Sequence, residues 1–175
     1  IFRGRGAEDG AALELVDHVV ALLDESIAKS RTLSHELSPP VLYQSGLCDA
    51  LDWLARQVQT RYGFTLHLQA SAEAEPPSEA LKGFLYRAAQ EMVFNAVKHA
   101  RVQEAWLDLE RIDGRIRLTV RDEGQGFEVG RIGRGFGLFS IQERIGLLGG
   151  TLEIESGPGA GSTFILTLPE AVQAD

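Results

Sequence analysis

A carboxylate and an amide stand four residues apart in an otherwise apolar helical pattern, and they are the first candidates for chemistry in this chain. Glu91 and Asn95 lie within residues 81–100, whose apolar side chains recur at three- and four-residue steps. This spacing places both at the edge of the apolar stripe, where an unpaired buried carboxylate would cost on the order of several kcal/mol. The helix alone leaves two interpretations open, a solvated polar pair and a functional pair.

Three glycine-rich stretches follow downstream. Residues 122–127 (DEGQGF) end a predicted strand, so Asp122 can project from the sheet edge while the glycines let backbone approach a ligand. Residues 133–138 (GRGFGL) directly precede a helix, whose free amides form an anion site without the P-loop signature. Residues 157–163 (GPGAGST) are most simply a hairpin turn. Each stretch alone is a weak signal.

Helices and strands must position these residues. The sequence predicts a helix over 47–62 closed by Gly63 in the left-handed conformation, and a helix over 81–100 capped by Ser78. Asp113-Gly114 is typical of a hairpin turn. The remaining predicted elements are a loop over 70–77, a helix through 140–148, and strands over 64–69, 105–111, 115–121, 151–155 and 162–168. This order favours an α+β fold, a two-layer sandwich whose sheet is covered by helices on one face.

A long helix is predicted ahead of this fold. The apolar positions of residues 11–37 repeat at about 3.5 residues, which suits pairing with another helix, and Pro39 and Pro40 end the pattern. Residues 1–10 form a lead-in without periodicity. Packing of the long helix on its own domain is the alternative to self-association.

Composition narrows the classes of function. The net charge of −8 over 175 residues argues against a nucleic-acid-binding surface. The single cysteine, Cys48, fits a reducing compartment and a packing role. No apolar run approaches the roughly 18 residues needed to cross a bilayer and no signal peptide is visible, so we expect a soluble piece. Because the chain begins at Ile1 and not at Met, we expect a fragment or a processed chain.

In their order and spacing, four motifs resemble the ATP-binding domain of sensor histidine kinases, in the superfamily shared with gyrase and MutL. Residues 91–100 match the N box, residues 122–126 the first glycine motif, residues 135–138 the second and residues 159–163 the third. The resemblance covers about residues 46–169, and the phrases around the N box are similar to the nitrate-sensor-type subfamily, which has a short ATP lid. The resemblance implies a Bergerat-type ATPase fold, with ATP and Mg²⁺ as cofactors.

The resemblance also implies a role for each matching residue. Asp122 would accept a hydrogen bond from the adenine amino group, and Gly124 and Gly126 would leave room for the base. Asn95 would hold Mg²⁺ through its carbonyl oxygen, and Glu91 would orient or deprotonate the incoming imidazole. Thr163 would support Asp122, and the groups expected near the phosphates are Lys98, His99, Arg134 and the amides of Gly135, Gly137 and Leu138.

The phosphoacceptor is not evident. Residues 34–40 (SHELSPP) look like the histidine box of the larger kinase subfamily, but sixty positions between His35 and Asn95 leave no room for a second hairpin helix. Residues 41–47 instead resemble the end of that second helix in the nitrate-sensor-type subfamily, and nothing in residues 1–30 matches its acceptor motif. We therefore expect residues 1–45 to be a lead-in and the second helix of a dimerisation hairpin whose first helix is missing from this chain. We expect residues 46–169 to be the catalytic domain and residues 170–175 to be a tail.

The expected function is the catalytic part of a two-component sensor histidine kinase. It would transfer the γ-phosphate of ATP to a histidine on a helix missing from this chain, and thence to a response-regulator aspartate. We expect a homodimer in the intact protein, a cytoplasmic location (free or as part of a membrane-anchored sensor), and no nucleic-acid or membrane contact by this fragment. The alternatives are a serine kinase of the anti-sigma-factor type, which normally lacks the long helix, and a degenerate non-catalytic module, which predicts damaged motifs.

Overall fold

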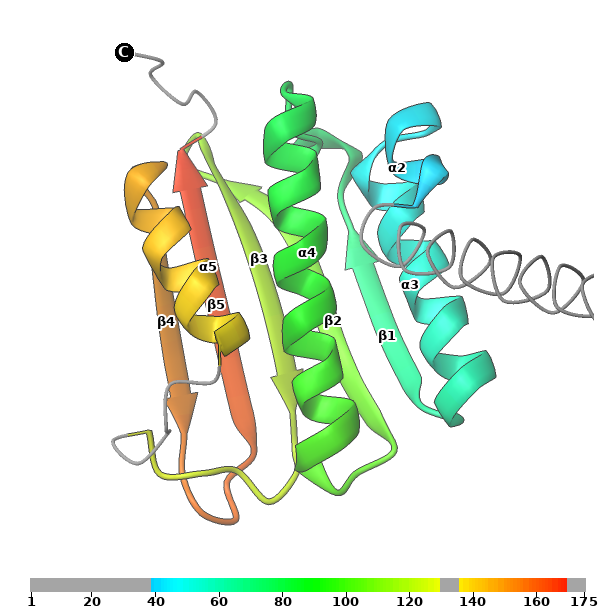
Figure 1. Ribbon diagram of the computed structural model, residues 1–175, viewed down its shortest axis with the longest axis vertical. Coiled ribbons are helices and arrows are strands. Elements are labelled where there is room, and N and C mark those ends of the chain that lie inside the picture. The colour runs from blue at the N-terminus through cyan, green and yellow to red at the C-terminus, as the bar shows by residue number, and fades with distance from the viewer. Residues whose placement is uncertain (1–38, 130–135, 170–175) are drawn as a thin grey trace, which may run out of the picture. The chain divides into compact units, whose positions relative to one another are not determined.

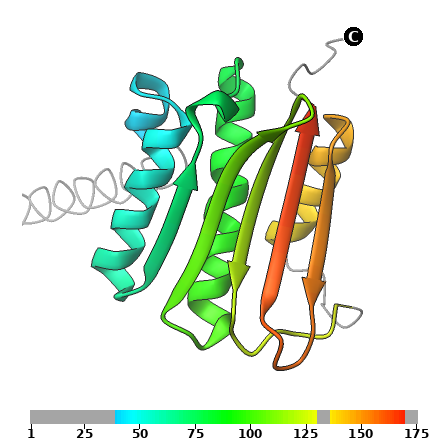
Figure 2. The ribbon, with the colours of Figure 1, turned by 180° about the vertical axis from the view of Figure 1, so that it is seen from behind.

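The computed structural model describes residues 39–129 and 136–169 (Figure 1). The chain divides after Pro39 into two units, and nearly all of these residues belong to the second. In this unit every described α-helix lies on one face of a five-stranded sheet, as the two opposite views show (Figures 1 and 2). The predicted two-layer α+β sandwich is thereby confirmed. The predicted long helix over 11–37, with His35, lies outside the described residues.

The sheet is mixed, with the strand order β1-β2-β3-β5-β4. Its edge strand β1 pairs in parallel with β2, whereas the other three pairings are antiparallel. The parallel pair needs a crossover, and the helix between the two strands supplies it. The bounds are β1 Thr65–Ala70, β2 Glu104–Ile112, β3 Arg115–Asp122, β4 Thr151–Ser156 and β5 Ser162–Pro169, each within one residue of the prediction.

Three main helices cover the sheet: α3 (Leu47–Tyr62), α4 (Glu79–Asn95) and α5 (Phe136–Leu147). The predicted ends of the first two are confirmed. Gly63 closes α3 with φ 65°, and the Ser78 hydroxyl caps α4 by accepting a hydrogen bond from the Leu81 amide at 3.3 Å.

Helix α4 does not continue to Ala100 as a regular α-helix. Residues Ala96–Ala100 form a π-helical turn, and Arg101 ends it in the left-handed conformation with φ 61°. The predicted helix over 81–100 is confirmed in its extent, but its last turn is π-helical and not α-helical. The last two carbonyls of this turn, those of His99 and Ala100, accept hydrogen bonds from Gln125.

Two short elements were missed by the sequence analysis. Helix α2 (Pro40–Gln44) begins at the second of the two prolines, because proline suits the first position of a helix as well as it ends one. A 3₁₀ turn, η1 (Ala72–Ala74), interrupts the predicted loop. Leu42 of α2 is fully buried in the same core as α3 and α4, so residues ahead of the expected domain start at Gly46 pack with this domain.

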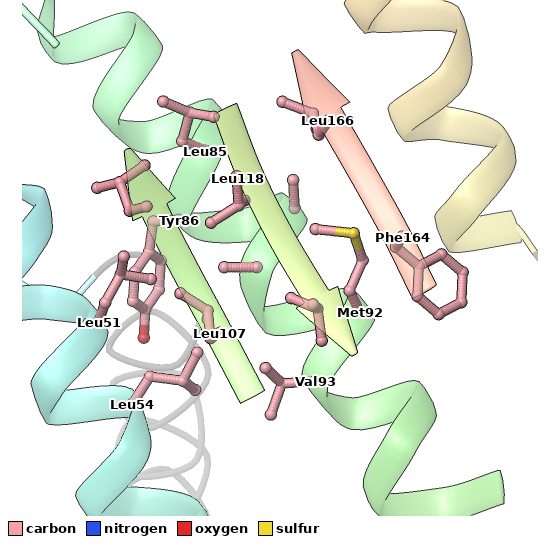
Figure 3. Close-up of a cluster of buried hydrophobic side chains, with 14 of the residues drawn as sticks. Leu51, Leu54, Leu85, Tyr86, Met92, Val93, Leu107, Leu118, Phe164 and Leu166 are labelled. Carbon is pink, nitrogen blue, oxygen red and sulfur yellow. The ribbon is translucent and has the colours of Figure 1, made fainter. Parts of the chain in front are cut away.

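The core lies between the sheet and the helices, and α4 is its centre (Figure 3). Met92, Val93 and Leu85 of α4 are fully buried against strand residues such as Leu107 and Leu118. Burying this face of α4 fixes its rotation about its own axis. Its polar residues near the end of the helix are thereby held at the edge of the core, beside the ends of the strands.

None of the helices in the described part of the chain is long and apolar enough to cross a membrane. Cys48 is half-buried at the start of α3, where its thiol contacts the Ser71 carbonyl at 3.6 Å. Burial, and after it the negative charge of Glu75, raises the pKa of the Cys48 thiol to about 11. These contacts agree with the expected packing role.

Candidate functional site

The motif residues meet in a cavity of about 360 Å³ at one end of the sheet. In Figure 1 this is the lower edge, where α4 and β3 end and where the chain turns from β4 to β5. The cavity therefore collects segments that are distant in sequence. Its lining consists of Glu91, Asn95, His99, Ala100, Asp122, Gln125, Gly126, Phe127, Leu138, Ser162 and Phe164.

Asp122 is the last residue of β3 and is a buried charged group, with 5% of its surface exposed. One of its carboxylate oxygens, Oδ1, accepts a hydrogen bond from the Gly124 amide at 2.9 Å. This bond fixes the rotation of the carboxylate. The cavity is thus lined by an oriented acceptor, as the sequence analysis expected for this residue.

The loop after Asp122 lies between the end of α4 and the β4–β5 turn. A Cβ atom on Gly124 would lie 2.1 Å from the Ala100 carbonyl oxygen, so only glycine fits here. Gly126 has φ +57°, and a Cβ on it would lie 2.0 Å from the Gly157 carbonyl oxygen. The Gly161 amide also donates to the Gly124 carbonyl at 3.0 Å. The third glycine stretch is the predicted hairpin turn, and it also supports this loop.

Glu91 and Asn95 project from α4 at the edge of the core, and both line the cavity. The Asn95 side-chain nitrogen Nδ2 is buried without a hydrogen-bond partner. An unsatisfied buried amide costs about 1 to 3 kcal/mol, so this group is suited to meet a ligand. Gly137, at the start of α5, lies against Glu91. A Cβ atom on Gly137 would be 2.0 Å from Glu91 Oε1.

The expected phosphate-side residues are placed differently from one another. His99 lines the cavity, whereas Lys98 does not and instead holds its ammonium group 5.7 Å from the centre of the Phe94 ring. Leu138 lines the cavity from the first turn of α5. Arg134 and Gly135 lie outside the described residues.

The sequence analysis placed Thr163 beside Asp122, but the structure places Ser162 there. In the β3–β5 pair, Asp122 lies opposite Ser162 and Arg121 lies opposite Thr163. Because successive side chains of a strand point to opposite faces, Ser162 shares the cavity face with Asp122 and Thr163 does not. The burial alternation of β5 already distinguishes the two faces, so the sequence pattern contained the signal that was missed.

Three other lining residues were not expected. Phe127 and Phe164 form an apolar wall with ring centres 6.2 Å apart, and Gln125 bonds to the end of α4. The Phe127 amide donates to the Ser156 hydroxyl at 2.9 Å, which attaches the wall to β4. Gln125 and Phe127 stand between and beside glycines and gave no periodic signal, whereas Phe164 lies on the alternating buried face of β5.

Comparison with known families gives one match that covers more than half of the chain. The family model for the histidine kinase-, DNA gyrase B-, and HSP90-like ATPase matches residues 81–172. This range contains the residues that line the cavity.

Curated relatives extend the similarity to nearly the whole chain. A sensor histidine kinase, MctS, of Rhizobium johnstonii is 36% identical over 167 residues, which are 93% of this chain and 36% of that protein. The oxygen sensor histidine kinase NreB of Staphylococcus carnosus is 32% identical over 161 residues, which are 89% of this chain and 46% of that protein. The chain thus spans less than half of the length of either relative.

Solved structures agree on the fold. The histidine kinase domain of a blue-light activated histidine kinase from Erythrobacter litoralis superposes with a TM-score of 0.61 at 22% identity, over 70% of this chain and 60% of that one. At this identity the likeness concerns the arrangement of helices and strands alone.

Proposed function

Since the chain belongs to the histidine kinase-, DNA gyrase B-, and HSP90-like ATPase family, we propose that it is the ATP-binding catalytic part of a two-component sensor histidine kinase. The observation that carries the proposal is one cavity lined by a buried, oriented Asp122 together with Glu91 and Asn95 of α4. The sensor histidine kinases among its relatives support the same function.

Adenine recognition is assigned to Asp122. Its Oδ1 is held by the Gly124 amide, so its second oxygen is the acceptor for the exocyclic amino group of adenine. Guanine carries a carbonyl at that position, which would face the carboxylate and be rejected. Ser162 lies opposite Asp122 in the β3–β5 pair and lines the same cavity, and the wall of Phe127 and Phe164 offers an apolar surface to the base. In this proposal Ser162 takes the supporting role that the sequence analysis gave to Thr163.

Triphosphate binding is assigned to the cavity side formed by α4 and α5. Asn95 would hold Mg²⁺ through its amide oxygen, and the ion would neutralise charge on the phosphates. The amides of Gly137 and Leu138 begin a 12-residue helix and can bind anionic oxygens. His99, Lys98, Arg134 and Gly135 remain predicted phosphate contacts.

Glu91 is assigned as the general base. Its carboxylate would orient an incoming imidazole and accept the ring proton while the imidazole nitrogen attacks the γ-phosphorus and ADP leaves. The acceptor histidine would lie on a dimerisation helix outside this chain, and the phosphoryl group would pass on to an aspartate of a response regulator. A homodimer and a cytoplasmic location of this part belong to the same proposal.

The proposal is tested by calorimetric titration with Mg²⁺ and each of ATP, ADP and GTP. We expect the wild-type chain to bind ATP and ADP but not GTP. Asp122→Asn should weaken ATP binding by at least about tenfold, since an oriented charged acceptor is lost. Asp113→Asn is the matched control, because Asp113 stands in the β2–β3 turn outside the cavity and asparagine tolerates its φ of 50°. Equal affinity for ATP and GTP, or an unaffected Asp122 variant, would refute the adenine assignment.

The catalytic assignment needs a second measurement. With a dimerisation segment of a related sensor kinase as added acceptor, Glu91→Gln should retain ATP binding and lose phosphoryl transfer by about a hundredfold or more. A phosphoamino-acid analysis identifies the product, because phosphohistidine is lost in acid and phosphoserine is not. An acid-stable product would favour the serine-kinase alternative.

A further inference from the structure

We infer that Gln125, a residue given no role so far, is a positioning residue that holds the loop of Asp122 on the end of α4 before nucleotide arrives. The inference rests on the proposed function, and it concerns how the adenine end of the cavity is organised. Gln125 stands between the two glycines of the first glycine motif and lines the cavity.

Gln125 makes hydrogen bonds to two separate parts of the domain. Its backbone amide donates to the Ala100 carbonyl at 2.8 Å, and its side-chain Nε2 donates to the His99 carbonyl at 2.7 Å. Its own carbonyl accepts from the Gly159 amide at 2.6 Å. One residue therefore joins the end of α4 to the β4–β5 turn through the loop.

The two acceptors are available because of how α4 ends. The last carbonyls of a helix have no partner within it, and here they belong to a π-helical turn that stops at Arg101. The primary amide of glutamine reaches one of these carbonyls while the neighbouring backbone amide reaches the other. A side chain without a donor at position 125 would leave the His99 carbonyl without this bond.

The position of this loop determines the orientation of the adenine acceptor. Asp122 Oδ1 is held by the Gly124 amide, and Gly124 lies directly against the Ala100 carbonyl. A loop that leaves α4 therefore takes with it the amide that orients the carboxylate. Holding the loop in place beforehand lowers the ordering cost that nucleotide binding would otherwise carry.

The Gln125 side chain contributes more to the position of the loop after Asp122 than to the stability of the fold. The backbone bonds to Ala100, Gly159 and Gly161 remain when the side chain is changed. The side chain is also largely exposed, so its removal opens no cavity in the core. We therefore expect a defect in the site with little loss of stability.

The test compares Gln125→Met, which removes the donor at nearly constant size, with Gln125→Lys, which supplies a donor of another kind. Gln103→Met is the matched control, because Gln103 is exposed and does not line the cavity. We expect Gln125→Met to weaken ATP and ADP binding by about three- to tenfold, with Gln125→Lys recovering most of the loss. The urea midpoints of all three variants should stay close to that of the wild type.

Amide hydrogen exchange of the nucleotide-free chain tests the inference without any binding. Residues 124–126 should exchange about three- to tenfold faster in Gln125→Met than in the wild type or in Gln103→Met. Unchanged exchange and unchanged ATP affinity in Gln125→Met would overturn the inference while leaving ATP binding intact. Absent ATP binding in the wild type would instead refute the proposed function. Failure of Gln125→Lys to recover either property would also overturn the role of the donor.

Discussion

Gly124→Ala should damage the domain itself, because the atom that its new methyl group meets cannot move away. The added Cβ would lie 2.1 Å from the carbonyl oxygen of Ala100. A carbon–oxygen contact is comfortable at about 3.3 Å, so loop and helix end must separate by about 1.2 Å. The oxygen belongs to the backbone of the π-helical turn, which the core beside it holds in place.

The size of the effect follows from the hydrogen bonds that this separation breaks. The bond from the Gln125 amide to Ala100 measures 2.8 Å and does not survive such a shift. The bond from the Gly161 amide to Gly124, 3.0 Å long, lies on the opposite side of the loop and is distorted as the loop is pressed against the β4–β5 turn. The bond from the Gly124 amide to the Asp122 carboxylate is weakened as well. Together these losses amount to about 3 to 4 kcal/mol. The smaller entropy of alanine in the unfolded chain offsets about 1 kcal/mol of that loss.

We therefore expect Gly124→Ala to lower the free energy of unfolding by about 2 to 3 kcal/mol. Urea unfolding followed by tryptophan fluorescence measures it, since Trp53 and Trp106 are both in the described domain. The midpoint should fall by about 1 M at constant slope. Gly157→Ala is the control, because its Cβ would meet its nearest neighbour at an ordinary 3.8 Å. If both variants unfold at the wild-type midpoint, the contact between a Cβ at position 124 and the Ala100 carbonyl does not destabilise the domain.

The other predictions concern groups that can adjust more freely. In Gly137→Ala the new methyl group meets the flexible carboxylate of Glu91, so phosphoryl transfer should fall tenfold or more. The free energy of unfolding in urea should fall by less than about 1 kcal/mol. Normal phosphoryl transfer would contradict this prediction. Glu75→Gln should lower the free energy of unfolding by about 1 to 2 kcal/mol in the same assay. The reason is that both carboxylate oxygens of Glu75 accept hydrogen bonds from the first amides of α3, from Leu47 at 2.7 Å and from Cys48 at 3.2 Å. An unchanged urea midpoint would refute this capping role. The pKa of the Cys48 thiol is raised from 9.0 to about 11, so at pH 8 the folded chain should be alkylated about a hundredfold more slowly than the urea-unfolded chain. The alkylation rate of the folded chain should rise as the pH approaches 11. Equal rates in the folded and unfolded chains would show that the thiol is not shielded.

Local pattern was sufficient to predict most of the fold. The strands were placed within one residue because one face of the sheet is buried, which imposes strict alternation on sequences such as that of β3. The helix ends at Gly63 and Ser78 were predictable because their capping contacts are made within a few residues. The four motifs likewise placed Glu91, Asn95 and Asp122 in one cavity.

Contacts between distant segments were not predictable in the same way. Helix α3 begins at Leu47, and the preceding Gly46 makes no side-chain capping bond. The first amides of the helix are bound instead by Glu75, 28 residues away from Leu47. The end of the π-helical turn is bound by a donor from Gln125, which follows two further strands. The position of Ser162 opposite Asp122 was predictable from the sequence. The alternation of β5 was visible there, but the motif match indicated Thr163 as the residue that supports Asp122.

The π-helical turn also constrains the number of residues between Asn95 and Arg101. A π-helical turn holds one residue more than the α-helical turn it replaces, so it is equivalent to a single insertion near the end of α4. Deleting one residue from 96–100 would restore a regular helix but would rotate everything beyond the deletion by about 100°. The His99 and Ala100 carbonyls would then face away from the loop. Sequences that share this cavity should therefore tolerate substitution at Val97 far better than any change in the number of residues between Asn95 and Arg101.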